Sequence, residues 1–452
     1  MTGTSPSRKS AYVALFVLML SYLLSYVDRT ALGVLQEPIK QELGLSDWQL
    51  GLLSGPAFAL LYSIVGLPLA RLSEHRNRSV ILAACLVLWS VMTMVCGLAR
   101  TYAQMLLARV GVSIGEAGGT PAAHSLIADL FPSKERGRAL AFYSFGAPAG
   151  AFLGAVTAGW LAHHYGWRTA FIMLGPPGFV LAIAVIWLVP QLQRGRLDVN
   201  AGQAQDDAPP PPFSAVLKVF FSNPVLRHSA AGAALIVLVG YGIASFLPSF
   251  LIRRYGLDIG AVGLISGLVN GVGAGVGTLA SGFAADRFGA RNVRFYSWLP
   301  AIMVTAAAPC FILGFLSSTL AVAVPLLMIA TLAIFTYLAP TFAQMHNMID
   351  ARMRATASSI MYLIMNLIGL GIGPPLIGLI SDYMTRVALT QAAGSGLVPR
   401  CVGAVASLPV CQHAAGIGIT YALVVISLIL FWAAAHFWIA GYHVGRRRHA
   451  VE

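Results

Sequence analysis

Long apolar runs, separated by short polar segments, account for most of the chain. Nearly all of these runs reach the roughly 20 residues that a helix needs to cross the hydrocarbon core of a bilayer. Lipid offers the backbone no hydrogen-bonding partner, so each run is expected to be a helix. The pattern therefore predicts an all-α membrane protein with twelve transmembrane helices. They lie near residues 11–35, 48–71, 79–99, 102–130, 137–164, 168–190, 226–252, 259–284, 291–315, 318–346, 354–384 and 413–441.

A polar stretch at residues 191–225 divides the twelve runs into two sets of six. It is too polar to span a membrane, and four consecutive prolines at 209–212 are typical of a stiff linker. An amphipathic pattern within it predicts a short helix, lying either on the membrane surface or packed on the cytoplasmic face of the protein. The apolar positions of this helix are Phe213, Val216, Leu217 and Phe220. We expect six-helix lobes at 1–190 and 226–452, joined by the linker 191–225.

The two sets of runs are related in sequence. A shift of 212 positions places Gly44 on Gly256 and Leu45 on Leu257. The same register continues without a gap and pairs Gly51 with Gly263, Leu52 with Leu264, Ser54 with Ser266, Gly55 with Gly267, and Glu74 with Asp286. Parallel repeats about an axis along the membrane normal describe a two-lobed transporter fold. We therefore expect the lobes to be related by a pseudo-two-fold axis.

The charge of the chain agrees with a membrane topology. Only 10% of residues are charged, against about 25% in soluble domains, and the formal net charge is +13. Twenty of the 29 lysines and arginines lie in loops on the side of the two termini, and seven lie on the other side. The positive-inside rule then places both termini in the cytoplasm. No soluble segment combines a basic patch with aromatic residues, which argues against a nucleic-acid partner.

The loop after the run at 259–284 carries a motif of small, acidic and basic residues. Its defining positions are Gly282, Asp286, Arg287, Gly289 and Arg291. The pattern resembles the conserved loop motif of the major facilitator superfamily, G-x-x-x-D-R-x-G-x-[RK]. Glycine lets helices approach closely, and a carboxylate at a helix end can cap a neighbouring helix or pair with a base. We expect a latch that favours one conformation of a transporter; the alternative is a solvated basic loop.

The corresponding loop of the first half is a degraded copy of this motif. Glu74 keeps the acid and Arg78 keeps a base, whereas His75 replaces the usual arginine and Asn77 the glycine. We expect Glu74 and Arg78 to contribute to the latch in the first lobe.

Four ionisable residues fall inside apolar runs, where a charge is costly and is functional by default. Asp28 and Arg109 lie about seven residues from the outer ends of their runs, so at about 1.5 Å per residue both are roughly 10 Å below the same surface. Glu116 lies two turns deeper than Arg109, within reach of the long side chain of Arg29. We expect the two acids and two bases to form one cluster.

Such a cluster can couple transport to protons. Burial favours the protonated form of a carboxylate, and a nearby guanidinium favours the charged form, so a moving arginine changes proton affinity. We expect Glu116 to be the main proton carrier and Asp28 the second, with Arg29 and Arg109 as partners or as anchors for an anionic substrate. His124 lies eight residues after Glu116 on nearly the same face and is a candidate proton relay. The alternative is a static ion-pair lock.

Three segments of the first half carry a closer resemblance. They are Tyr26-x-Asp28-Arg29, the run from Arg109 to Ala117, and Ile127-Ala-Asp-Leu-Phe131. They resemble the spinster family of the major facilitator superfamily, whose animal members export lysophospholipids or sphingosine phosphate and whose bacterial members are thought to be proton-coupled. The resemblance implies a proton-coupled secondary transporter that works by alternating access and moves an amphiphilic or lysolipid-like anion.

Two other functions are compatible with a polytopic chain. A proton-driven multidrug exporter would share the fold and differ in substrate. An intramembrane enzyme would need a nucleophile beside a base, and the sequence offers none. Gly111-Val-Ser-Ile-Gly115 matches the nucleophile elbow of hydrolases, but that elbow follows a strand, and this segment lies within an apolar helix. We expect no enzyme activity.

The remaining expectations concern cysteines, partners and location. Cys401 and Cys411 share one outside loop, where a disulfide and two free thiols are both compatible with the sequence. No cysteine or histidine spacing indicates a metal site, and we expect no metal or cofactor. We expect a monomer in the bacterial inner membrane, with membrane lipid, protons and the small-molecule or lysolipid substrate as partners.

Overall fold

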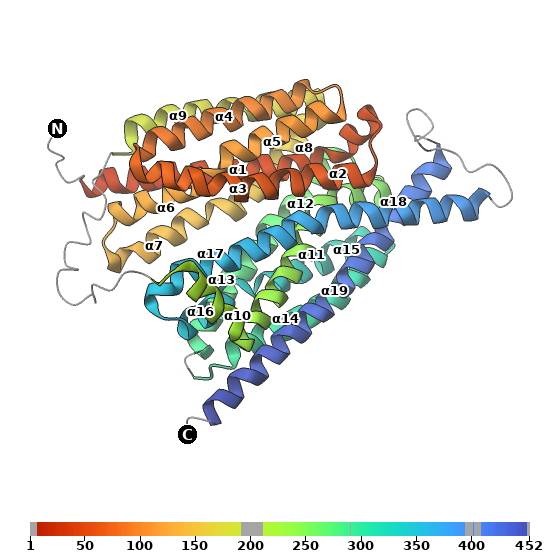
Figure 1. The fold of residues 1–452 in the computed structure, drawn as a ribbon. Helices are drawn as coiled ribbons and strands as arrows, with labels where there is room; N and C mark the ends of the chain where they lie inside the picture. Colours follow the sequence, from red (N-terminus) through yellow and green to blue (C-terminus); the bar gives the residue numbers. More distant parts are fainter. Residues whose placement is uncertain (1–6, 191–210, 290, 394–400, 402–407, 450–452) are drawn as a thin grey trace, which may run out of the picture. The chain divides into compact units, whose positions relative to one another are not determined.

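The computed structural model describes residues 7–190, 211–289, 291–393, 401 and 408–449 (Figure 1). These residues form α-helices with short 3₁₀ and π segments, and they contain no β-strand. Their contacts divide them into two compact units.

The first unit contains the described residues up to Ile39, those from Ala57 to residue 190, and Ile259–Gly267. Its helices are α1 (Arg8–Leu43) as far as Ile39, α3 (Pro56–His75), α4 (Arg78–Leu98), α5 (Tyr102–Ala117), α6 (Gly119–Leu130), α7 (Ser133–Ser144), α8 (Gly146–Leu174), α9 (Pro176–Leu188) and α12 (Ile259–Gly267). Residues of the second sequence half, those of α12, therefore pack in this unit against α8.

The second unit contains Lys40–Pro56, the described residues from 211 to 258, and those from Leu268 onward. Its helices are the end of α1, α2 (Asp47–Ser54), α10 (Phe213–Ser222), α11 (Pro224–Tyr255), η2 (Leu268–Gly273), α13 (Ala274–Gly289), α14 (Phe295–Leu316), α15 (Leu320–Phe335), α16 (Leu338–Met348), η3 (Ala351–Met353), α17 (Arg354–Ile364), η4 (Met365–Leu370), α18 (Gly371–Ala393) and α19 (Pro409–His449). The elements η2 and η4 are π-helical, and η3 is a 3₁₀ turn.

Ten helical stretches of the described residues are long and apolar enough to cross a membrane. One of them, Glu135–Leu188, has 54 residues, or about 80 Å as a straight helix, which is more than twice a bilayer core. It is broken at Gly166, whose φ of 81° is non-helical, so it supplies two spans. The stretch filled by α5 and α6, which meet at Gly118, supplies another. The predicted all-α membrane fold with twelve spans is confirmed.

Two glycines end equivalent helices in the same way. Gly44 follows α1 and Gly256 follows α11, and both have a φ of 65° in the left-handed region that glycine adopts most easily. These are the residues that the 212-position shift aligns. The backbone therefore repeats at the position where the sequence repeat begins.

The predicted amphipathic helix of the linker is α10. Val216 and Phe220 are buried, and the helix contacts α11 and α17 within the second unit. Phe213 and Phe221 are exposed. Part of the predicted apolar face, Val216 and Phe220, therefore packs on protein, whereas Phe213 of the same face is exposed. Residues 191–210 of the predicted linker lie outside the described residues.

Candidate functional site

An ion pair joins α1 to α5 in the interior of the first unit. Arg29 donates a hydrogen bond of 2.8 Å from Nε to Oε2 of Glu116, and the Glu116 side chain is 1% exposed. Glu116 can lie this deep because α5 packs tightly on α4: a Cβ on Gly115 would lie 2.6 Å from the backbone nitrogen of Trp89. The structure thus brings together the pair that the depths of Arg29 and Glu116 suggested.

Aromatic rings surround the Arg29 guanidinium. Its central carbon lies 4.4 Å from the ring centroid of Phe58, 5.1 Å from that of Tyr62 and 5.2 Å from that of Tyr26. Ring faces attract a cation, and the attraction is stronger where water is excluded. The rings of α1 and α3 therefore hold the guanidinium against Glu116 without adding charge.

The second acid and the second base come from the same two helices, α1 and α5. Asp28 is buried at 4% exposure and accepts a hydrogen bond of 3.0 Å from the Thr93 hydroxyl of α4. Arg109 of α5 is 2% exposed, and it acts electrostatically on Asp28, Glu116 and Cys96. The four predicted residues thus form one formally neutral cluster from α1 and α5, with α4 supplying Thr93.

The pairing of this cluster is incomplete. Nε and Nη1 of Arg109 and Oε1 of Glu116 are buried, and within the described part of the chain none of the three has a hydrogen-bond partner in normal geometry, although the Ser25 side chain also interacts with the Glu116 carboxylate. Buried polar atoms in proteins are otherwise satisfied by protein groups or by ordered water, so these atoms require water, a proton or a ligand. Glu116, the predicted proton carrier, therefore has one carboxylate oxygen that can still accept a proton or a hydrogen bond.

A small cavity with room for about one water molecule opens on Glu116. Residues of α1, α4, α5, α6 and α7 line it: Ser21, Tyr22, Ser25, Leu82, Trp89, Glu116, Gly119, Thr120, Ala123 and Tyr143. The predicted relay residue His124 does not line it, but its ring lies edge-on against Tyr143, with 5.3 Å between the ring centroids. His124 thus reaches the cavity only through a tyrosine.

The predicted loop motif in the second unit shows no latch contact. Asp286, Arg287 and Arg291 are exposed, and none of them forms a hydrogen bond or ion pair through its side chain with another described residue. Gly289 is buried, and a Cβ there would lie 2.4 Å from the Tyr296 ring, whereas Gly282 has open space beside it. Close packing explains Gly289 but not Gly282.

In the first unit, Arg78 forms buried polar contacts between α4 and α6. It pairs with Asp129 of α6 and donates a 2.8 Å hydrogen bond to the Ser125 hydroxyl. Arg78 and Asp129 are both buried. Glu74 lies in α3, and its side chain is outside the described residues.

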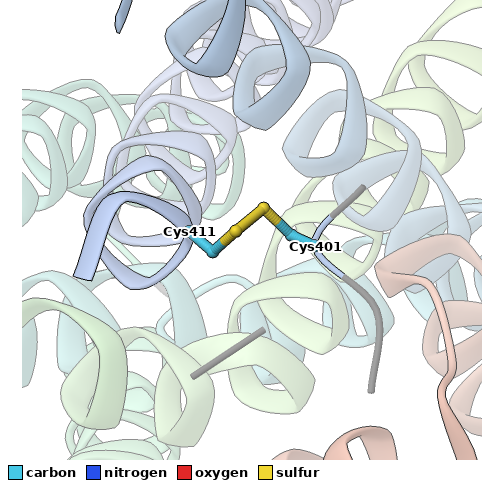
Figure 2. Close-up of a disulfide and its surroundings, with 2 residues drawn as sticks. All are labelled: Cys401 and Cys411. Carbon is cyan, nitrogen blue, oxygen red and sulfur yellow. A yellow bond between two sulfur atoms is a disulfide. The ribbon is translucent and has the colours of Figure 1, made fainter. Parts of the chain in front are cut away.

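Cys401 and Cys411 form a disulfide in the second unit, with 5.6 Å between their Cα atoms (Figure 2). The bond joins the start of α19 to the segment that precedes it, and Cys411 is buried beside Leu389 of α18. Of the two alternatives for this pair, the structure has the disulfide. In the described residues, no three His, Cys, Asp or Glu side chains converge as a metal site would require.

Sequence reasoning missed the neutral and peripheral partners of these charges. Thr93 lies in an apolar run with no pattern that marks it as a partner of Asp28. Asp129 appeared only as part of a resemblance, and Asp47 was not singled out. A search for acids at helix ends facing buried arginines would have found Asp47 and Asp129.

Comparisons with known proteins agree with this architecture. A family model described as the Major Facilitator Superfamily matches residues 18–374. An "MFS-type efflux pump" of Mycolicibacterium smegmatis is 34% identical over 390 residues, covering 86% of this chain and 89% of the relative. Human "Protein spinster homolog 1" is 28% identical over 418 residues, covering 85% and 75%. A crystal structure of a bacterial homolog of the human lysosomal transporter Spinster, inward-facing and unoccupied, has a TM-score of 0.85 at 31% identity and covers 98% of both chains.

A buried charge cluster in a twelve-span helical fold, together with these matches, defines a membrane transport protein and not an enzyme. The chain belongs to the major facilitator superfamily, and within it the chain is similar to the spinster proteins.

Proposed function

We propose that this chain is a proton-coupled secondary transporter that works by alternating access and moves an amphiphilic or lysolipid-like anion. The observation that carries the proposal is Oε1 of Glu116, a buried carboxylate oxygen without a hydrogen-bond partner in the described residues, in a carboxylate held by Arg29. A proton on this oxygen would weaken the pull of Arg29 on Glu116. Arg29 would then be available to an anionic substrate, so that proton and substrate binding are linked.

The proposed substrate class rests on the similarity to spinster proteins and on the surroundings of Arg29. Guanidinium groups bind phosphate or carboxylate through two parallel hydrogen bonds. Arg29 is 19% exposed, whereas its partner Glu116 is 1% exposed, so the base is the more accessible member of the pair. The aromatic rings of Phe58, Tyr62 and Tyr26 would contact an apolar chain.

We further propose that the transporter acts as a monomer in the bacterial inner membrane, with both termini in the cytoplasm. The Lys and Arg distribution supports this orientation. The disulfide gives independent support, because disulfides persist in oxidising compartments and Cys411 lies at the start of α19, at the end opposite the C-terminus.

Transport in proteoliposomes with an imposed pH gradient tests proton coupling. Glu116→Gln should remove the pH dependence of transport, whereas the matched variant Glu135→Gln, which changes a more exposed carboxylate paired with Arg8, should keep it. Unchanged pH dependence in Glu116→Gln would overturn the assignment of the proton carrier.

Native mass spectrometry with lysophospholipids tests the substrate class. The wild-type chain should bind them, and Arg29→Ala should bind them at least about tenfold more weakly, since a charge-assisted bidentate contact is lost. Binding that is the same in both proteins would exclude Arg29 as the anchor.

A multidrug exporter is the second candidate, because the efflux pump of M. smegmatis is 34% identical to this chain. Competition by a panel of structurally unrelated cationic drugs, without competition by lysophospholipids, would favour it over the first proposal.

A further inference from the structure

Asp47, in the first turn of α2, is the centre of a second buried charge cluster, which lies entirely within the second unit. Arg253, at the end of α11, donates two hydrogen bonds of 2.7 Å, one to each carboxylate oxygen. Lys40, at the end of α1, donates a third of 2.6 Å, and the Ser381 hydroxyl of α18 donates a fourth of 2.6 Å. These four bonds fill the acceptor sites of the carboxylate.

Asp382 completes the cluster from α18. Its two oxygens accept hydrogen bonds from the backbone nitrogens of Asp47 at 3.0 Å and Trp48 at 2.9 Å, which are among the free N–H groups at the start of α2. The cluster thus holds two acids and two bases, with Asp47 and Arg253 almost fully buried. Removing one partner would leave an uncompensated charge in the interior.

The cluster holds a segment that is hinged at both ends. Lys40–Pro56, the hinged segment, belongs to the second unit, although the residues before and after it belong to the first. Pro38, just before it in α1, has no N–H to bond the carbonyl one turn earlier. Gly55, near its other end, separates α2 from α3 with non-helical angles of φ −103° and ψ −94°. One helical hydrogen bond is thus missing near the start of the segment, and the helix direction changes near its end.

The hinged segment contacts α18 through backbone surfaces. A Cβ on Gly51 would lie 2.5 Å from the Pro374 carbonyl oxygen, and a Cβ on Gly378 would lie 2.3 Å from the Asp47 carbonyl oxygen. Glycines allow this approach and leave no interlocked side chains at these points. The backbones are therefore in close contact at these points, while buried side chains of the segment such as Leu50 and Leu53 add apolar packing to the polar bonds.

We propose that Asp47 is a conformational latch, whose bonds to Arg253, Lys40 and Ser381 hold the hinged segment on α11 and α18. Release of these bonds opens the transporter at the end where α1 and α11 terminate. Alternating access requires a contact at each end of a transporter that can be made and broken in every cycle. The Asp47 carboxylate, with all four acceptor sites filled, on a segment with a break near each end meets that requirement. This device is separate from the proposed proton site and stands whether or not Glu116 carries the proton.

Cysteine accessibility tests the latch. Leu50 of α2 is fully buried, so a Leu50→Cys variant in nanodiscs should react with a maleimide only when the hinged segment moves far enough to expose this position. Adding Asp47→Asn should raise the reaction rate at position 50 by at least about tenfold. Peptide mass spectrometry separates this site from Cys96, a fully buried native thiol of the first unit that reports general unfolding in the same molecules.

Two further variants calibrate the test. Ser381→Ala removes one of the four bonds and should raise the rate at position 50 by only about two- to fivefold. Asp350→Asn makes the same chemical change at a half-exposed carboxylate paired with Arg352 and should leave the rate unchanged. A rate in Asp47→Asn within twofold of its parent would overturn the proposal. An equal rise at Cys96 would also overturn it, because the cluster would then hold the whole fold.

Discussion

The two buried charge clusters of this chain contain the same kinds of residues and differ in how completely they are paired. In the first unit, Asp28, Arg29, Arg109 and Glu116 leave three buried polar atoms without described partners. In the second unit, the carboxylate of Asp47 accepts four hydrogen bonds. Both clusters contain two acids and two bases, so net charge does not distinguish them.

This difference separates two uses of buried charge. A cluster with every acceptor filled resists protonation, because a proton would displace an existing bond. A cluster with an empty acceptor and unpaired donors can take up a proton or a ligand with little rearrangement. The number of filled hydrogen-bond acceptor sites, and not burial or charge, therefore distinguishes the two carboxylates. It favours Glu116 as the proton carrier and Asp47 as a structural contact.

Among the changes to the two clusters, loss of Arg253 should lower the stability of the protein most. Arg253→Gln leaves Asp47 buried with one base, and breaking a buried pair costs about 3–5 kcal/mol. We expect the thermal midpoint of the purified protein in detergent to fall by several degrees. The neighbouring exposed residue provides the control, since Arg254→Gln should leave the midpoint unchanged. Equal midpoints for the two variants would show that the cluster around Asp47 contributes no stability.

Loss of the disulfide should have the next largest effect. The bond closes a segment with a sequence separation of 10, for which the loop-entropy model gives about 2–3 kcal/mol. Cys401→Ser should lower the thermal midpoint and leave the pH dependence of transport intact. Reducing agent should lower the midpoint of the wild-type protein and should not change that of Cys401→Ser. Loss of pH dependence in this variant would mean that the second unit also controls the proton site.

Asp28→Asn should separate stability from coupling in the first unit. The amide oxygen of asparagine can still accept the Thr93 hydrogen bond, and Glu116 remains as a counter-charge for the arginines, so the stability should fall by about 1–2 kcal/mol, less than at Arg253. If Asp28 carries a coupled proton, a pH difference of one unit can drive about tenfold accumulation, and the variant should lose it. Substrate accumulation in proteoliposomes measures this loss, with Asp258→Asn, at an exposed site, as the control.

The smallest effect is expected at the loop motif. Asp286 is exposed and has no side-chain partner among the described residues, so Asp286→Asn should change the free energy of unfolding by no more than about 0.5 kcal/mol. Arg78→Gln, which removes the buried partner of Asp129, should cost several times more in the same unfolding measurement. Comparable losses in both variants would mean that the two copies of the motif are equally engaged.

Much of the fold could be predicted because membrane helices follow from the length of apolar runs. The break at Gly166 falls between the predicted runs 137–164 and 168–190, as expected. Breaks inside a predicted span could not be placed in this way. Helix α2 ends before Gly55 within the run 48–71, and α5 ends before Gly118 within the run 102–130, while many other glycines in spans remain helical. The helix around the first span is also longer than its apolar run, since α1 extends from Arg8 to Leu43 beyond the predicted 11–35.

The central cluster was more predictable than the peripheral ones. A charge in an apolar run is rare, so four such residues at compatible depths point to one another. Asp47 lies beside a capping serine, Ser46, at a helix start, where an acid needs no further explanation. Its partners Arg253 and Ser381 are more than 200 positions away, and no local pattern encodes contacts of that range.

The π segments η2 and η4 have a consequence for how this chain tolerates change. A π turn holds more residues than an α turn, so each of these two helices carries surplus length at a defined place. Deleting a residue elsewhere in a span would rotate every later side chain by about 100° around the axis. A deletion within Leu268–Gly273 or Met365–Leu370 can instead be absorbed by tightening the turn, which keeps the faces at both ends of the helix in register.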